Sequence, residues 1–209
     1  MNPGRQGVTK ESRATMARPA RVPVEVIERF MLDVFVALGV PPEEARICTD
    51  VLIASDVRGI ESHGIGRLKY YYDRITAGIQ YPQTRLEIVK ETETTALLDG
   101  NLGLGLYVGP YAMEMAIRKA KTFGIGFVAV KNSTHYGIAG YYVTMATDAG
   151  CIGFSGTNAR PSIAPTFGVE PMLGMYVCCY SVRAFKLCSY GLWLSTDNCT
   201  QALMRRDRK

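Results

Sequence analysis

Two histidines carry most of the chemistry that this sequence offers. His63 stands in Ser-His-Gly and His135 in Thr-His-Tyr-Gly, and the chain of 209 residues has no others. Because an imidazole titrates near neutral pH, either ring could deliver or remove the proton of a hydroxyl or carbonyl centre. Ser62 or Asp56 could fix the ring of His63 through a hydrogen bond. The alternative, that each histidine is only a solvated or capping residue of a turn, stays open.

A dense set of ionisable groups surrounds His63 in residues 55–67. Arg58 and Arg67 lie in this stretch, and a planar guanidinium matches a substrate carboxylate better than a lysine ammonium does. We therefore expect both arginines to bind an acidic substrate. Arg58 also has an alternative, since it could form an ordinary surface ion pair with Glu61.

Other classes of site have little support. The histidines lie far apart along the chain and the six cysteines do not reproduce the paired spacing of a zinc site, so we expect no metal. The Ser-His-Gly triplet is not a nucleophile elbow, which reads Gly-x-Ser-x-Gly. The run Gly103-x-Gly105-x-x-x-Gly109 is one residue longer than the dinucleotide fingerprint. We expect these glycines to cap a helix or allow close packing, with a phosphate loop as the alternative.

The composition is that of a globular protein, with 47% apolar residues in a chain long enough to bury a core. The net charge of +5 gathers in residues 1–21 and 205–209, so we expect no basic face and no nucleic-acid partner. No apolar run reaches the ~18–20 residues of a membrane span, and no membrane association is expected. Residues 1–21 predict a disordered basic leader without an export signal, and hence a cytoplasmic protein. The arginine content of this leader allows one alternative, a mitochondrial transit peptide.

Apolar spacing predicts the elements that position these groups. Helices are expected over residues 24–38, 42–56 and 68–75, and strands over residues 86–90 and 94–98. The glycine-bounded segment 59–66 interrupts the helical pattern. His63 should therefore lie on a connector between two helices.

The second half of the chain predicts a strand–helix–strand unit. A helix over 112–123 is followed by a strand over 126–130, a helix over 138–149 and a strand over 152–156. We expect the two strands of this unit to be buried and to pair in parallel. Ligands of open α/β sheets bind beyond the carboxyl ends of strands, which is where residues 132–135 and then Thr157 and Asn158 fall. The proline-rich residues 161–174 predict a loop, and residues 175–209 show no steady period and predict no fold.

Four segments in the same order resemble the motifs of one protein family. They are residues 55–67, the turn 98–105 (Leu-Asp-Gly-Asn-x-Gly-x-Gly), the segment 130–137 (Val-Lys-Asn-Ser-x-His-x-Gly) and residues 157–174, with Thr-Asn-Ala and Glu-Pro-x-Leu-Gly. The family is the type-2 malate/L-lactate dehydrogenases, a group with ureidoglycolate, sulfolactate and 2,3-diketogulonate dehydrogenases and without a Rossmann fold. The resemblance implies an α/β protein with an N-terminal helical segment and a mixed or parallel sheet.

The resemblance also implies an activity. Family members are NAD- or NADP-dependent oxidoreductases of small 2-hydroxy and 2-oxo acids, usually homodimers with the active site near the subunit interface. His63 resembles their acid–base histidine, with Ser62 and Arg67 beside the substrate. His135 corresponds to a second active-site histidine, which some members assign as the proton acceptor. Thr157 and Asn158, discussed above as strand-end residues, would fall near the nicotinamide or the substrate.

The resemblance divides the chain into regions and stops after Gly174. The regions are a leader (1–21), a helical region for substrate binding and dimerisation (22–123), the start of an α/β cofactor-binding domain (124–174) and a divergent tail (175–209). The family continues with Thr-Asn-Pro and later Leu-Asp-x-Ala-Thr-Ser, which this sequence lacks. We therefore expect a fold that is incomplete at the C-terminus, and a frame change or alternative exon near codon 175 would explain it. The alternative function is a truncated, catalytically silent fragment that retains only subunit pairing.

Overall fold

The computed structural model describes residues 21–158, 161–164, 167–174, 177–184 and 188–194. Its helices are α1 (Val24–Ala37), α2 (Pro42–Val57), α3 (Leu68–Thr76), α4 (Gly105–Phe123) and α5 (Ala139–Asp148), with two 3₁₀ turns, η2 (Glu61–His63) and η3 (Ile65–Arg67). Its strands are β1 (Glu87–Glu91), β2 (Thr95–Asp99), β3 (Phe127–Lys131), β4 (Gly153–Thr157), β5 (Pro161–Ile163), β6 (Leu173–Gly174), β7 (Val177–Ala184) and β8 (Cys188–Leu194). In the described part of the chain, we find no helix with the length and apolar character needed to cross a bilayer. The predicted leader lies outside the described residues, apart from residue 21.

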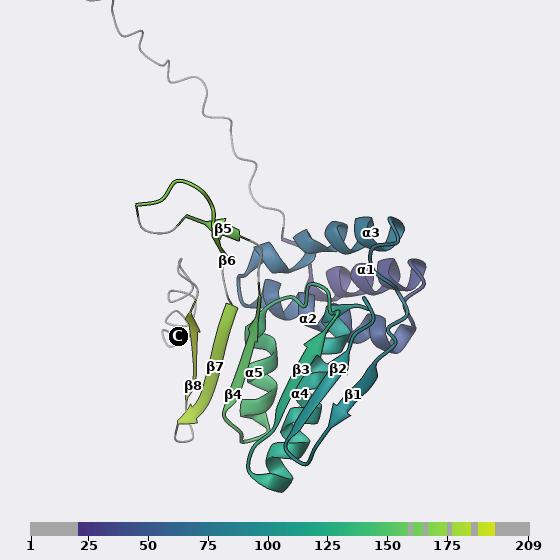
Figure 1. The fold of residues 1–209 in the computed structure, drawn as a ribbon. Helices are drawn as coiled ribbons and strands as arrows, with labels where there is room; N and C mark the ends of the chain where they lie inside the picture. The colour runs from purple at the N-terminus through teal and green to yellow at the C-terminus, as the bar shows by residue number, and fades with distance from the viewer. Residues whose placement is uncertain (1–20, 159–160, 165–166, 175–176, 185–187, 195–209) are drawn as a thin grey trace, which may run out of the picture.

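The molecule combines a layer of helices with a mixed sheet, β1-β2-β3, and an antiparallel sheet, β4-β7-β8. Helices α1, α2 and α3 lie together at one end, and α4 and α5 run alongside the strands (Figure 1). Strand β2 is the centre of the first sheet, antiparallel to β1 and parallel to β3. This arrangement confirms the predicted α/β class with an N-terminal helical segment.

The predicted parallel pairing of β3 with β4 is wrong. Strand β3 pairs with β2, so the parallel crossover is made by α4 and not by α5. Strand β4 pairs antiparallel with β7, and β7 pairs with β8. The prediction failed because β7 and β8 belong to residues 175–209, where no element was expected. The first sheet also crosses residue 123, since β2 lies before this boundary and β3 after it, and the division into functional regions stays a prediction.

The predicted loop 161–174 holds two short strands. Strands β5 and β6 form a small antiparallel pair within it. Pro161 is the first residue of β5, a position that tolerates the missing backbone N–H of proline. The segment is therefore a loop with a minimal hairpin at its base.

The helices begin and end where the sequence supplies the signals. Pro42 opens α2 in the first turn, and Glu43 and Glu44 follow it at the positive end of the helix dipole. Gly39 ends α1 with a φ of +86°, a conformation that favours glycine. The buried face of α1 is narrower than its apolar pattern, because Met31 and Phe35 are fully buried while other apolar residues of α1 stay exposed.

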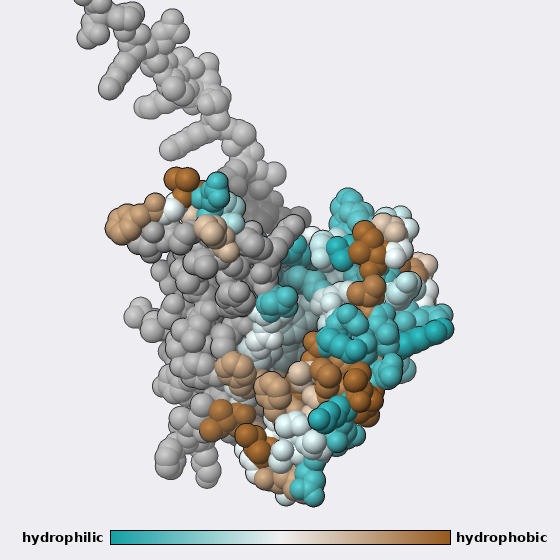
Figure 2. Space-filling view, viewed as in Figure 1, coloured by the Kyte–Doolittle hydropathy of each residue, from teal (hydrophilic) through white to brown (hydrophobic). Residues whose placement is uncertain are grey.

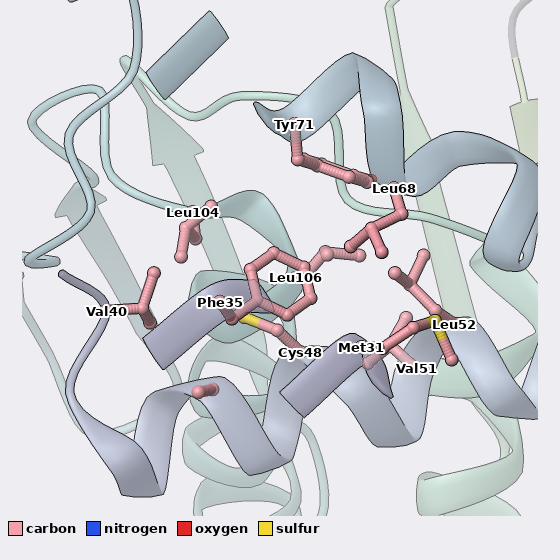
Figure 3. Close-up of a cluster of buried hydrophobic side chains, with 11 residues drawn as sticks. Met31, Phe35, Val40, Cys48, Val51, Leu52, Leu68, Tyr71, Leu104 and Leu106 are labelled. Carbon is pink, nitrogen blue, oxygen red and sulfur yellow. The ribbon is translucent and has the colours of Figure 1, made fainter. Parts of the chain in front are cut away.

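One cluster of buried side chains joins the helical layer to the start of α4. It contains Met31, Phe35, Val40, Ala45, Cys48, Val51, Leu52, Leu68, Tyr71, Leu104 and Leu106 (Figure 3). Cys48 is fully buried in this cluster, and burial raises the pKa of its thiol, so it serves as a small core residue. Tyr71 brings a hydroxyl into this otherwise apolar cluster from α3. The cluster fixes α3 against α2 and α4.

A second cluster attaches α4 to the sheet. Ala96 and Leu98 of β2 pack against Ala112 and Met115 of α4, and side chains of β3 close the group. Because β2, α4 and β3 form one packed unit, the segment that follows β3 leaves the sheet from a fixed point. That segment carries His135.

Candidate active site

The structure brings the two histidines together from distant parts of the chain. His63 lies in η2, between α2 and α3, and His135 lies on the loop between β3 and α5. Their rings are stacked, with centroids 5.5 Å apart and planes inclined by 23°. Two imidazoles at this separation can act on one small molecule.

The connector that holds His63 is anchored by Asp56. The Asp56 carboxylate accepts a hydrogen bond from the Ile65 backbone N–H at 2.8 Å. A side chain at Gly64 would collide with this carboxylate, so the close approach requires glycine. The Ser62 hydroxyl lies 2.8 Å from Nδ1 of His63. Of the two predicted partners of the ring, Ser62 is the one in contact, and Asp56 holds the backbone instead.

The loop that holds His135 is tied to the start of α4 through Thr134. The Thr134 hydroxyl accepts hydrogen bonds from the Gly105 N–H and from Nε2 of Gln80, each at 2.9 Å, and donates to the Gly103 carbonyl at 2.8 Å. A Cβ at Gly105 would strike the backbone carbonyls of Thr134 and His135. The interpretation of Gly103-x-Gly105 as close-packing glycines is therefore confirmed.

His135 has a further partner that the sequence analysis missed. The Tyr71 hydroxyl lies 2.6 Å from Nδ1 of His135, and the Gly137 N–H donates to the same nitrogen at 3.3 Å. Tyr70 meets the His135 ring edge-on, at 5.6 Å between centroids. The sequence did hold a signal for Tyr71, because residues 71 and 74 are spaced so that they share one face of a helix with Arg67.

Arg67 reaches this group and is joined by a second arginine. The guanidinium groups of Arg67 and Arg74 lie 5.6 and 5.3 Å from the centre of the Tyr70 ring. The Nε atom of each is buried without a hydrogen-bond partner among the described residues. The Arg58 guanidinium donates to the Ala54 carbonyl at 3.1 Å, within its own helical segment. The positive charge at the histidines thus comes from α3 and the turn before it.

Burial and these cations keep both imidazoles neutral. Burial lowers the pKa of His63, and Arg67 lowers it further. Burial also lowers the pKa of His135 to about 4, with added repulsion from His63, Arg67 and Arg74. At neutral pH each ring therefore has one N–H donor and one acceptor nitrogen.

A cavity of about 490 Å³ opens next to the histidine loop. Its lining includes residues from the carboxyl ends of β3 and β4 and from α4. Asn132, Thr157 and Asn158 line it, and so do Thr134 and Tyr136, the neighbours of His135 in the chain. A cavity therefore lies beyond the two strand ends where ligand binding was expected, and the roles of Thr157 and Asn158 in cofactor binding stay a prediction. Among the residues that the structure describes, no group of three or more His, Cys, Asp or Glu side chains could hold a metal ion.

Comparison with known proteins identifies a family that this chain resembles along most of its length. The family model of malate/L-lactate dehydrogenase matches residues 22–184, including residues 175–184 of the predicted divergent tail. Malate dehydrogenase of Pyrococcus abyssi is 52% identical over 154 residues, 74% of this chain and 42% of its own length. L-sulfolactate dehydrogenase of Methanocaldococcus jannaschii is 46% identical over 70% of this chain and 43% of its own length.

Solved structures give the same result. The structure of malate dehydrogenase from Pyrococcus horikoshii OT3 superposes with a TM-score of 0.81 at 44% identity, over 85% of this chain and 51% of that one. The chain spans about half the length of the relatives it matches. The extent of the family match and the shared fold show that this chain belongs to the malate/L-lactate dehydrogenase family.

Proposed function

We propose that this protein is an NAD- or NADP-dependent oxidoreductase that interconverts a small 2-hydroxy acid and its 2-oxo acid. The observation that carries the proposal is the stacked pair of neutral histidines beside the guanidinium of Arg67. Family relatives named malate and sulfolactate dehydrogenase support the same class of reaction.

The residues of the site divide the work between binding and proton transfer. Arg67 binds the substrate carboxylate, for which its buried Nε has no other partner among the described residues. His63 and His135 serve the transfer of the substrate hydroxyl proton. Ser62 orients His63 through Nδ1 and leaves Nε2 of this ring toward the substrate. Tyr70 and the histidine rings exclude water from the reacting carbon.

The cavity beyond β3 and β4 suits a nicotinamide group. Its lining offers the hydroxyl of Thr157 and the amide side chains of Asn132 and Asn158, which match the polar carboxamide of the cofactor. When bound, the nicotinamide supplies or accepts the hydride. Thr157 and Asn158 hold and orient it beside the histidine loop.

A second acidic group on the substrate would explain Arg74. Arg67 and Arg74 both lie over Tyr70, and the structure gives neither an ion pair among the residues it describes. Two such cations can bind two acid groups of one molecule. Malate and sulfolactate, from the names of the relatives, are acids of this kind. The proposed substrates are therefore 2-hydroxy acids with a second carboxylate or a sulfonate.

The same proposal includes a cytoplasmic homodimer. Apolar surface gathers in the lower half of the view in Figure 2, over the strands. Ile88, Val89, Phe127, Ile152 and Phe154 are each between 44% and 74% exposed. A patch of this kind is typical of an interface.

Cofactor titration tests the proposal against the alternative of a silent fragment. The full chain is titrated with NADH and with NADPH, and binding is followed by cofactor fluorescence. Saturable binding of one cofactor, with turnover of malate or sulfolactate, supports the proposal and selects the cofactor. If neither cofactor binds and neither acid is turned over, the result would favour a protein that retains only subunit pairing.

Two matched variants test the substrate class. Arg67→Gln should raise KM for every 2-hydroxy acid, and Arg74→Gln should raise KM for malate but not for lactate. Loss of a charge-assisted contact of about 1.5–3 kcal/mol corresponds to a KM increase of about 10- to 150-fold. Lys69→Gln is the control, because Lys69 lies on the same helix and its side chain is 80% exposed. Equal KM changes for malate and lactate in Arg74→Gln would contradict the assignment of the second acid group.

A further inference from the structure

The contacts at Nδ1 of His135 determine where this ring carries its proton. The backbone N–H of Gly137 points at Nδ1 over 3.3 Å, and a backbone amide can only donate. Nδ1 must therefore present its lone pair. The Tyr71 hydroxyl, 2.6 Å from the same nitrogen, must then donate as well. With two donors at Nδ1, the single proton of the neutral ring lies on Nε2.

We propose that Tyr71 is a positioning residue that holds His135 as the neutral Nε2–H tautomer, so that His135 donates a hydrogen bond to the substrate oxygen while His63 transfers the proton. The division of roles rests on the proposed function, whereas the tautomer of His135 does not. In the direction of oxidation, the hydroxyl proton moves to Nε2 of His63. The hydride, with its two electrons, leaves the carbon for the nicotinamide, and His63 later releases the proton to water.

Tyr71 is held so that its hydroxyl has little freedom. The side chain is fully buried in the core cluster, at whose edge it lies in Figure 3. Its ring packs against Phe35 at 6.2 Å and against Tyr70 at 5.5 Å between centroids. Burial raises the pKa of Tyr71 well above its ordinary value, so the phenol keeps its proton for donation.

A cationic His135 would be in conflict with its surroundings. Protonation would place a hydrogen on Nδ1, facing the Gly137 N–H and the Tyr71 hydroxyl. The titratable and charged groups that face the ring are His63 from η2, Arg67 from η3, and Tyr70, Tyr71 and Arg74 from α3. None of these groups carries a negative charge at neutral pH. His135 is therefore suited to donate a hydrogen bond and poorly suited to take up a proton.

His63 differs at the corresponding nitrogen. Its Nδ1 faces the Ser62 hydroxyl at 2.8 Å, and a hydroxyl can donate or accept. When Nε2 of His63 takes up a proton, Nδ1–H can donate to the Ser62 oxygen without loss of the contact. The partner of His63, the Ser62 hydroxyl, therefore tolerates a protonated ring. The Gly137 N–H at His135 does not, because it can only donate.

Nitrogen NMR of the imidazoles tests the tautomer without any need for activity. The full chain is labelled with ¹⁵N, and the long-range ¹H–¹⁵N spectrum is recorded near neutral pH. Two histidines give two ring systems once any histidine-containing purification tag has been removed, and His63→Asn assigns them by elimination. The expected result for His135 is a pyrrole-type Nε2 and a pyridine-type Nδ1. A pyrrole-type Nδ1 in the wild-type protein would overturn the proposal.

Tyr71→Phe removes the hydroxyl and keeps the ring in the core. The expected result is a shift of both His135 nitrogens toward the averaged values of mixed tautomers, together with a higher imidazole pKa. Tyr72→Phe is the control, since Tyr72 lies on the same helix with 48% of its surface exposed, and it should leave the spectrum unchanged. His135 shifts and pKa that stay unchanged in a folded Tyr71→Phe protein would contradict the role of Tyr71. Should this variant not fold, the wild-type spectrum alone still decides the tautomer.

Kinetics separate this inference from the proposed function. Tyr71→Phe should lower kcat more than it changes KM. It should also shift the acidic limb of the pH–rate profile to higher pH, because His135 becomes easier to protonate. Turnover combined with an Nδ1–H ring would overturn the inference and leave the proposed function intact. An Nε2–H ring in a protein without turnover would support the tautomer and reject the proposed function.

Discussion

The substitution Gly64→Ala should break the hydrogen bond between Asp56 and Ile65 that anchors the connector carrying His63. A methyl group at this position would occupy the space of the Asp56 carboxylate, so the carboxylate has to move away from the Ile65 N–H. A hydrogen bond to a charged group contributes about 1.5–3 kcal/mol to stability. Because Asp56 is only partly buried, we expect a loss near the lower end, about 1.5 kcal/mol.

A double-mutant cycle measures whether this mechanism is correct. Urea unfolding gives the free energy of unfolding of Gly64→Ala, Asp56→Ala and the double variant. If the methyl group acts by displacing the carboxylate, then each single variant loses the same hydrogen bond. The double variant should then lose about 1.5 kcal/mol less than the sum of the two single losses. Additive losses would refute the explanation, because they would mean that Gly64 and Asp56 act independently.

Three further predictions concern the histidines and the core. His63→Ala should abolish turnover with little change in thermal stability, and an equal loss of folding would make His63 structural. Stability should fall as the pH drops from about 6.5 toward 4, since in this range the unfolded chain takes up a proton on His135 while the folded protein, in which burial lowers the pKa of this ring to about 4, does not. Thermal unfolding should show a smaller fall in His135→Gln. Leu52→Ala, at a fully buried position, should cost about 2–5 kcal/mol in urea unfolding, and a loss below 1 kcal/mol would contradict tight packing there.

The histidine connector is predictable from the sequence because its signals are local. The glycines that begin and end residues 59–66 interrupt a helical pattern, and the structure has two 3₁₀ turns there. The strand ends were also found, since a continuous apolar run followed by polar residues marks an end without any knowledge of partners. The order of the elements followed from such signals along most of residues 21–158.

Pairing and partner choice were not predictable in the same way. The partner of β3 lies on the other side of α4 in the chain, and no local pattern distinguishes it from β4. Arg74 was not singled out because a lone arginine late in a helix resembles any solvated residue. Its role depends on how α3 docks, and that is set by packing of Leu68 and Tyr71 in the core.

The stacked histidines report on the order in which the chain assembles. His63 belongs to the helical layer, whereas His135 follows β3 of the first sheet in the chain and its neighbour Thr134 is bonded to the start of α4. The two rings can meet only after these layers have docked, and contacts between segments so distant in the chain form slowly because a large loop must close first. A partly folded intermediate with helices but no docked sheet would therefore lack the ring pair entirely. The contact between the imidazoles therefore marks the completed docking of the helical layer onto α4 and the first sheet.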